Sequence, residues 1–361
     1  MKKNPNNYCI IMAGGFGSRF WPICSLTKPK QFLDLLGTGE SMIQNTFRRF
    51  ETICPRENIF IVTTKAHESM VRRQIPDLGE NQVLCEPFRR NTAPCIAYAA
   101  SVIAGINPNA NVVVTPSDHA IFGEQDFCQN LSDAMRIIDS HDWIVTLGAK
   151  PSNPNIKYGY IQFREAEIRG TTSRLHKAIT FVEKPPLDMA CQFIASGEFL
   201  WNAGIFVWRL PVLMEAYRKH LPQLAATFFN LTLDTPAKQL REVYTQAENI
   251  SVDYGIIEKA DNVYVMEADF GWSDVETWES LFEAKPKDDN GNAISSGRVL
   301  TYDTHNCVVH LNSEKYAVIQ GLDNYIIAAG TDTLLICPRD QEEQIFKFAS
   351  DVEMKKMMSK K

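Results

Sequence analysis

Residues 8–31, YCIIMAGGFGSRFWPICSLTKPKQ, contain a short apolar segment, then a glycine loop, an arginine and a Lys-Pro-Lys turn. The apolar segment predicts a buried β-strand that ends where the glycines begin. Because Gly14, Gly15 and Gly17 have no side chains, the loop backbone can bring several N–H donors close to phosphate oxygens. This part of the chain therefore predicts a strand followed by a turn that binds a polyphosphate.

Two residues of this stretch carry positive charge that suits a phosphate. The Arg19 guanidinium can bind two phosphate oxygens at once, and the Lys30 ammonium acts as a point charge. Two commoner phosphate motifs do not fit: the Gly-Lys-Ser/Thr of the Walker A pattern is missing, and G-x-G-x-x-G would need a glycine where Phe20 stands. A tight turn with incidental charges is the alternative interpretation.

Composition limits the class of protein. A length of 361 residues is typical of about two domains, and 45% hydrophobic with 22% charged residues is ordinary for a globular protein. The net charge of -6 argues against a general nucleic-acid binder but leaves room for a small anion. Nine cysteines without C-x-x-C spacing are typical of reduced thiols in the cytosol. Since no export signal or membrane span is visible, we expect a cytoplasmic protein with neither a nucleic-acid nor a membrane partner.

The organisation of the chain predicts the α/β fold class. Strand-like and helix-like stretches alternate from residue 8 to about residue 285, which is the pattern of parallel βαβ units. Residues 59–63 and 111–115 suit central strands that are buried on two faces, and residues 92–104 predict a helix between them. We therefore predict a Rossmann-like sheet, mixed but mostly parallel and flanked by helices, over residues 1–285.

The sequence changes character after Pro286. Short β-prone pieces follow one another too closely for helices to lie between them, near 299–302, 307–311, 316–319, 325–328 and 334–337. Residues 341–358 have apolar side chains at helical spacing and lysines at the carboxyl end. We predict a second, β-rich domain over residues 286–361. Its terminal helix packs on the β unit or on another subunit, which makes a homodimer possible.

Two aspartates follow predicted strands. Ligands of open parallel sheets bind beyond the carboxyl ends of the strands, and Asp118 and Asp274 both come after such ends. Magnesium usually takes one or two protein carboxylates and completes its octahedron with water and phosphate oxygens. The pair therefore predicts a Mg²⁺ site beside nucleotide phosphates.

Local structure offers another interpretation of both aspartates. Asp118 suits the start of a turn. Asp274 lies at the start of a predicted helix over residues 275–284, where Ser273 and Glu276 fit a capping box.

Polar residues follow two further strand-like segments. Glu183 and Lys184 end TFVEKP, and Asn202 lies within FLWNAGIFVW. Carboxylate and amide groups suit sugar hydroxyls, and the lysine suits a second phosphate. A solvated surface is the alternative interpretation of the Glu-Lys pair.

Taken together, these segments resemble the mannose-1-phosphate guanylyltransferases (GDP-mannose pyrophosphorylases) of the sugar nucleotidyltransferase superfamily. The resemblance covers nearly all of residues 8–285 and lies in the family's order. It rests on FGSRFWPICSLTKPKQF, EPFRRNTAPCIAYAA, VVVTPSDHAI, YGYI, FVEKP, WNAGIF, SVDYGIIEK and DFGWSDVETW. It implies a nucleotidyltransferase fold of the GT-A-like kind, followed by a short left-handed β-helix in the C-terminal domain. The longer members carry a further isomerase domain, so we expect a single activity here.

The resemblance also implies roles for individual residues. The catalytic residues it implies are Arg19, Lys30 and Asp118. The nucleotide-binding residues it implies are Gly14, Gly15, Gly17, Ser18, Glu86, Arg90, Asn91 and Thr92. The sugar-phosphate side corresponds to Gly159, Glu183, Lys184, Asn202 and Asp253, and the metal carboxylates to Asp118 and Asp274. The chain departs from the family pattern at Phe16, Ser18, Lys28 and Glu276, the last standing where the family usually has glycine.

The reaction that the resemblance implies uses GTP and mannose 1-phosphate. A phosphate oxygen of the sugar phosphate attacks the α-phosphorus of GTP in line and pyrophosphate leaves, with Mg²⁺ as cofactor. A phosphate monoester is already ionised at neutral pH, so no catalytic base is needed. Alternatives are a different sugar 1-phosphate such as heptose or glucose, a different base, or a non-catalytic subunit that senses nucleotide sugars. A dehydrogenase fits less well because the dinucleotide pattern breaks at Phe20.

Overall fold

The computed structural model describes residues 3–15, 18–25, 27–164, 174–295, 298–311 and 316–359, without the side chain of Ser18. The chain forms two compact units, neither of which is continuous in sequence. Unit 1 comprises Met1–Gly14, Thr46–Ser117 and Ile121–Trp272, and unit 2 comprises Gly15–Asn45, Asp118–Ala120 and Ser273–Lys361. The sequence predicted a single domain boundary between residues 285 and 286, whereas each unit of the structure combines three separate segments.

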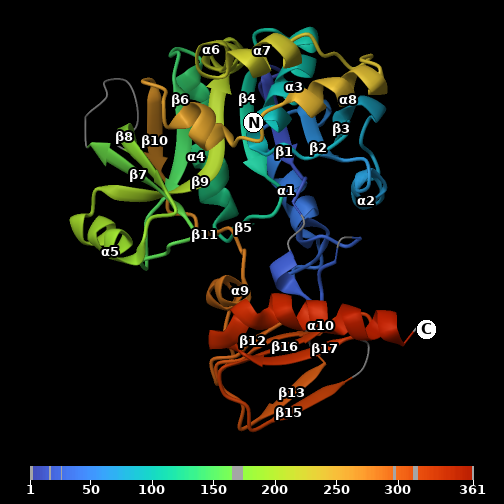
Figure 1. Ribbon diagram of the computed structural model, residues 1–361. Helices are drawn as coiled ribbons and strands as arrows, with labels where there is room; N and C mark the ends of the chain where they lie inside the picture. Colours follow the sequence, from blue (N-terminus) through green and yellow to red (C-terminus); the bar gives the residue numbers. More distant parts are fainter. Residues whose placement is uncertain are drawn as a thin grey trace. The chain divides into compact units, whose positions relative to one another are not determined.

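Unit 1 contains a nine-stranded sheet in the order β3-β2-β1-β4-β9-β6-β10-β8-β7 (Figure 1). Its strands are β1 (Asn7–Met12), β2 (Ile59–Thr64), β3 (Val83–Glu86), β4 (Asn111–Pro116), β6 (Ile144–Ala149), β7 (Gly159–Arg164), β8 (Leu175–Glu183), β9 (Phe199–Arg209) and β10 (Val263–Glu267). Strands β3, β2, β1 and β4 are parallel, as are β6 and β10, whereas β7, β8 and β9 run antiparallel to their neighbours. The predicted α/β fold class with a mixed sheet is confirmed.

Helices flank this sheet, and the predicted helix after residue 91 is one of them. The helices that lie wholly or partly in unit 1 are α1 (Met42–Phe50), α2 (Glu68–Gln74), α3 (Thr92–Ile106), α4 (Glu124–Ile138), α5 (Leu187–Ser196), α6 (Leu210–His220), α7 (Pro222–Phe228) and α8 (Ala237–Gln246), with the short helical turns η3 (Arg56–Asn58), η4 (Glu80–Gln82) and η5 (Asp253–Ile257). Two-residue strands, β5 (Ala120–Ile121) and β11 (Trp272–Ser273), lie where the chain passes from one unit to the other.

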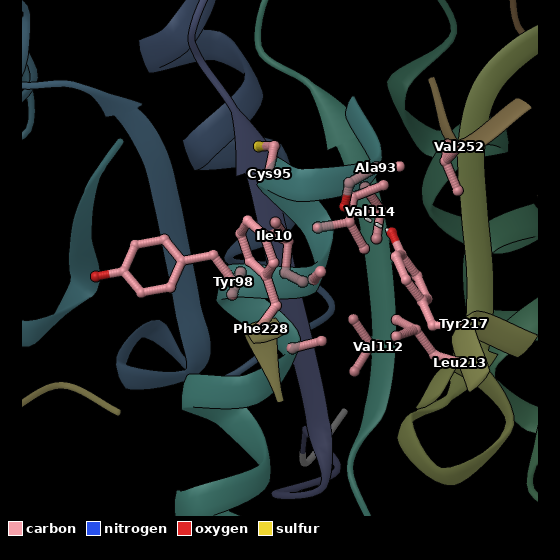
Figure 2. Close-up of a cluster of buried hydrophobic side chains, with 14 of the residues drawn as sticks. Ile10, Ala93, Cys95, Tyr98, Val112, Val114, Leu213, Tyr217, Phe228 and Val252 are labelled. Carbon is pink, nitrogen blue, oxygen red and sulfur yellow. Dashed lines mark hydrogen bonds between the residues drawn. The ribbon is translucent and has the colours of Figure 1, made fainter. Parts of the chain in front are cut away.

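The core of unit 1 forms where α3 packs against the central strands (Figure 2). Apolar residues of β1 and β4, such as Ile10 and Val112, are fully buried, as expected for parallel strands covered on both faces. Helix α3 is buried along most of its length because it is rich in alanine and isoleucine. Tyr217 of α6 donates its hydroxyl proton to the Ala93 carbonyl over 2.8 Å, so this buried phenol is satisfied. This packing fixes the first turn of α3.

Unit 2 contains the β-rich C-terminal region (Figure 1). Its strands are β12 (Ala293–Ile294), β13 (Val299–Tyr302), β14 (Val308–Leu311), β15 (Ala317–Gln320), β16 (Tyr325–Ala329) and β17 (Leu334–Pro338). Strands β12, β14 and β16 pair in parallel, β13 and β15 form a second parallel ladder, and β17 is antiparallel to β16. From β12 to β16, successive strands thus alternate between two ladders, which is how a β-helix coils.

The remaining elements of unit 2 are helical. They are η1 (Ser18–Phe20), η2 (Lys30–Phe32), α9 (Trp278–Ala284), η6 (Arg339–Gln344) and α10 (Ile345–Met358). Helix α10 packs Ile345 and Phe348 on the apolar cluster that also contains Ile326 and Ala328 of β16. The terminal helix therefore covers the β unit, one of the two positions expected from the sequence. No helix in the described ranges has both the length and the hydropathy of a membrane span.

Candidate active site

Lys30 is the centre of the predicted site in unit 2. It lies at the start of η2 and is only 4% exposed. Its Nζ lies 2.9 Å from Asp118 Oδ2, and it donates hydrogen bonds to the carbonyl of Asp274 at 2.9 Å and of Val275 at 3.1 Å. An ammonium has three protons to donate, and here each has an acceptor. The structure thus brings Lys30 together with Asp118 and the backbone of Asp274.

The segment that Lys30 holds has a strained backbone. Val275 has a φ of 44°, which is unusual for a β-branched residue, and its side chain is fully buried. This conformation corrects the expected helix start, because a residue at positive φ cannot belong to a right-handed helix. Helix α9 begins at Trp278, and the capping box is formed by Thr277 and Ser280. The predicted Ser273/Glu276 box is therefore wrong.

Both aspartates of the predicted metal site contact this lysine, Asp118 through its carboxylate and Asp274 through its backbone carbonyl. Burial raises the pKa of the Asp118 carboxyl, but the positive charges of Lys30 and then His119 outweigh it, so the pKa is lower than usual. The carboxylate Oδ1 of Asp274 accepts a hydrogen bond from the Glu276 N–H at 3.2 Å. Over the described part of the chain, no group of three or more His, Cys, Asp or Glu side chains is placed to hold a metal. Two hard carboxylates without a third protein ligand are the donor set that Mg²⁺ accepts when phosphate oxygens complete its shell.

Arg19 lies in the exposed part of the same unit. Its Nη1 lies 2.7 Å from Oε2 of Glu276, and the two side chains are 45% and 42% exposed. Gln31, which is buried, donates from Nε2 to the carbonyl of Gly15 at 3.0 Å and so supports the glycine loop. The predicted Gly17 and the side chain of Ser18 lie outside the described residues.

In unit 1, Gly14 lies two residues after the end of β1 and beside Glu86. A Cβ added to Gly14 would lie 3.6 Å from Glu86 Oε2, so the two residues approach closely. Glu86 is 4% exposed, and its Oε1 has no hydrogen-bond partner among the described residues. Burial raises its pKa to about 7, although nearby Tyr244 and Arg89 act in the opposite direction. Glu86 is thus a buried carboxyl with an unused acceptor, the kind of group that recognises an N–H donor of a ligand.

The other residues predicted around the nucleotide shape the start of α3. Asn91 caps this helix, with its side chain accepting the Thr92 N–H at 2.9 Å, and it has a φ of 68°. Thr92 Oγ1 accepts the backbone N–H of Val252 at 2.8 Å. The guanidinium of Arg90 donates to the carbonyls of Tyr244 and Thr245 near the end of α8, at 3.0 and 3.3 Å. Arg90 therefore binds protein backbone in this structure.

The residues predicted on the sugar-phosphate side also come together in unit 1. Gly159 of β7 is paired with Glu183 of β8, and a Cβ at Gly159 would lie only 2.4 Å from Glu183 Oε2. Glu183 Oε1 accepts a hydrogen bond from Lys184 Nζ at 2.8 Å. The absence of a side chain at Gly159 therefore makes room for the Glu183 carboxylate.

Asn202 and Asp253 extend this cluster. Asn202 Nδ2 donates to Asp253 Oδ1 at 2.8 Å, while its Oδ1 accepts the Gly204 N–H at 3.0 Å and the Thr146 hydroxyl at 3.4 Å. Burial and then the charge of Glu183 raise the pKa of Asp253 to about 6. Carboxylates and an amide with fixed orientation suit the hydroxyls of a sugar.

Sequence reasoning missed three contacts of these sites. Gln31 stands in the quoted Lys-Pro-Lys-Gln turn, but nothing local shows that its amide reaches Gly15. Glu276 was noted only as a departure from the family pattern and as part of a capping box, and the structure pairs it with Arg19. Tyr244, which influences Glu86, had no signal in the sequence.

Comparisons with known proteins identify the family. The family model described as nucleotidyl transferase matches residues 8–291. The alginate biosynthesis protein AlgA of Pseudomonas aeruginosa is 32% identical over 353 residues, which cover 95% of this chain and 72% of AlgA. A protein of Salmonella montevideo named mannose-1-phosphate guanylyltransferase is 31% identical over 355 residues, which cover 96% of this chain and 74% of that protein.

A solved structure is similar over nearly the whole chain. It is described as mannose-1-phosphate geranyltransferase from Thermus thermophilus, and the similarity covers 96% of this chain and 99% of that chain. The TM-score is 0.86 at 28% sequence identity. With a family model that spans most of its length and relatives of this similarity, the chain belongs to the nucleotidyl transferase family.

Proposed function

We propose that the chain transfers GMP from GTP to α-D-mannose 1-phosphate, giving GDP-mannose and pyrophosphate. Relatives over most of its length are named mannose-1-phosphate guanylyltransferase. The observation that carries the proposal is the buried Lys30 ammonium held between the Asp118 carboxylate and the carbonyl of Asp274. Such an arrangement fixes a positive charge and a carboxylate at one position, which phosphoryl transfer requires.

The residues of unit 2 act on the triphosphate. Arg19 binds phosphate oxygens through its guanidinium, which is exposed enough to reach a ligand. Lys30 keeps a positive charge close to the transferred phosphorus, and Gln31 holds the glycine loop through Gly15. These groups are in position before the reaction, so they stabilise developing charge without reorganising.

The chemical step forms one P–O bond and breaks another. A phosphate oxygen of mannose 1-phosphate attacks the α-phosphorus of GTP, and the bond between that phosphorus and the oxygen bridging to the β-phosphate breaks. The electron pair leaves with pyrophosphate. Since a phosphate monoester has a second pKa of about 6, the attacking oxygen already lacks its proton at neutral pH, and no side chain needs to act as a base.

The family generally uses a divalent metal ion, and we propose Mg²⁺ here. Asp118 and Asp274 would hold it, because Lys30 contacts the Asp118 carboxylate and the backbone carbonyl of Asp274 and so keeps both residues in one part of unit 2. When bound, Mg²⁺ neutralises phosphate charge and orients the phosphate oxygens. The Asp118 carboxyl suits this role, since its lowered pKa keeps it ionised.

The residues of unit 1 recognise the base and the sugar. The unused acceptor of Glu86 accepts N–H protons of guanine, and the Asn91–Thr92 turn orients the start of α3. Glu183 and Asp253 accept hydroxyl protons of mannose, with Asp253 oriented by Asn202. Lys184, 59% exposed, binds the phosphate of the sugar phosphate. The cytoplasmic location and the homodimer expected from the sequence remain predictions.

A substrate panel tests this function. Pyrophosphate release is measured with each of four nucleoside triphosphates and with mannose, glucose and heptose 1-phosphates, with and without Mg²⁺. We expect release with GTP and mannose 1-phosphate that depends on Mg²⁺. Faster release with another sugar phosphate would assign that sugar instead, and no release with any pair would overturn the proposed enzyme.

A further inference from the structure

Both cations of unit 2 that we assign to the triphosphate already contact an anion of the protein. The Lys30–Asp118 pair is largely buried, with side-chain exposures of 5% and 25%. The Arg19–Glu276 pair is nearly half exposed on both sides. A ligand can therefore reach Arg19 without opening the core of the unit, but it meets a guanidinium that is already occupied.

The backbone around Glu276 is held more firmly than that of an ordinary surface residue. Its N–H donates to the Asp274 carboxylate at 3.2 Å, and the Val275 carbonyl directly before it binds Lys30. The strained φ of Val275 determines the direction in which the chain enters Glu276. Because the backbone of Glu276 is held in place, its carboxylate can reach Arg19 without a rearrangement of the chain.

We propose that Glu276 is an internal competitor of the nucleoside triphosphate for Arg19. This inference rests on the proposed function, since it assumes that Arg19 binds the triphosphate. The carboxylate occupies the guanidinium in the absence of ligand, and a bound triphosphate displaces it. Because the triphosphate must first displace this carboxylate from Arg19, the competition raises the KM for GTP.

Kinetics of two variants test the competition. Glu276→Gln removes the charge and keeps the size of the side chain, whereas Glu276→Gly removes the side chain. We expect the KM for GTP to fall about two- to fivefold in both, the range of an exposed ion pair, with kcat changed by less than about twofold. The KM values for GTP of these variants and of the unmodified chain should become more similar in high salt, because salt screens exposed charges.

A matched control comes from the same segment of unit 2. Glu279 also pairs with an arginine, through two contacts to Arg339 at 3.0 and 2.6 Å. Glu279→Gln removes one charge three residues further along the chain but leaves Arg19 and Glu276 unchanged. We expect its KM for GTP to stay that of the unmodified chain.

A binding cycle separates competition from structural effects. Calorimetry of GTP with Mg²⁺ is performed on the unmodified chain, on Glu276→Gln, on Arg19→Gln and on the double variant. We expect Glu276→Gln to bind GTP more tightly than the unmodified chain does. In the Arg19→Gln background, adding Glu276→Gln should leave the affinity for GTP unchanged. An affinity of Glu276→Gln for GTP that is unchanged or weaker would overturn the competition. So would an equal gain in affinity when Arg19 is replaced. If the unmodified chain releases no pyrophosphate from GTP and mannose 1-phosphate, the proposed function fails instead, which is a separate result.

Discussion

The Lys30 ammonium lies 2.9 Å from the Asp118 carboxylate although the two residues belong to distant parts of the sequence. Two backbone carbonyls, of Asp274 and Val275, complete the acceptors of Lys30. Three segments of unit 2 thus meet at one buried positive charge. Lys30, which we expect to stabilise charge during transfer, therefore also holds the Asp274 backbone in place.

Replacing Lys30 by alanine should depress kcat by about 10²- to 10³-fold, the scale of losing one preorganised electrostatic contact. The variant should also unfold at lower temperature, because Asp118 and two carbonyls lose a buried donor. Pyrophosphate release and thermal unfolding measure the two effects. Lys28→Ala, at an exposed lysine of the same turn, is the control and should behave like the unmodified chain. Normal turnover by Lys30→Ala would remove Lys30 from the reaction.

Asp118→Asn should shift the magnesium dependence of the reaction. The amide keeps the shape of the side chain but offers Mg²⁺ a neutral oxygen, so we expect about a tenfold higher concentration of Mg²⁺ for half-maximal rate. A titration of pyrophosphate release with Mg²⁺ measures this. Asp126→Asn, at an exposed position in the first turn of α4, is the control. An identical titration for Asp118→Asn and the unmodified chain would exclude Asp118 from the metal site.

Glu86 should make the protein less stable as the pH rises. The pKa of Glu86 in the folded protein is about 7, above its ordinary value of 4.5. Between these two pH values the native state therefore keeps a proton that the unfolded state has lost. Stability therefore falls between these pH values, by about 3 kcal/mol. Glu86→Gln cannot titrate, so it should gain this amount relative to the unmodified chain as the pH rises through the interval.

Urea unfolding of both chains at a series of pH values measures this effect, with Glu80→Gln at an exposed carboxyl as the control. A difference between the Glu86→Gln and unmodified chains that stays constant with pH would show that Glu86 titrates normally.

Gly159→Ala should affect the sugar phosphate and not the nucleotide. The new methyl group would lie 2.4 Å from Glu183 Oε2, so the carboxylate must leave its position. We expect the KM for mannose 1-phosphate to rise about tenfold, while the KM for GTP changes little. Gly105→Ala in α3 is the matched glycine control, because the added Cβ would meet no atom within 4 Å beyond its chain neighbours and the backbone of its own helix. Equal changes in both KM values would contradict this assignment of Glu183.

Thr92→Val should destabilise unit 1 by about 1–3 kcal/mol. Valine has nearly the same shape but cannot accept the N–H of buried Val252, which then lacks its acceptor. Thr92→Ser keeps the hydroxyl and should retain most of the stability. Urea unfolding compares the three chains. If Thr92→Val and Thr92→Ser are equally stable, the hydrogen bond contributes nothing measurable.

Much of the fold could be predicted from local patterns. The helix expected over residues 92–104 is α3, and the five β-prone pieces after residue 286 all form strands, offset by one residue at most where they begin. The family resemblance is confirmed, because the nucleotidyl transferase model and the curated relatives match most of the chain. The helix expected from residue 275 starts instead at Trp278. The expected start rested on a local capping pattern. The positive φ of Val275, which prevents a helix there, lies in a segment whose carbonyls bind Lys30, a residue far away in the sequence.

Residue types and their spacing were enough to predict the buried strands, helix α3 and membership of the family, because each of these depends on neighbours over short distances. Which charges meet became visible only in the folded chain. Folding pairs Lys30 with Asp118 and Arg19 with Glu276, and it raises the pKa values of Glu86 and Asp253. Burial and the separation of two charges set these properties, and both arise when remote segments pack together.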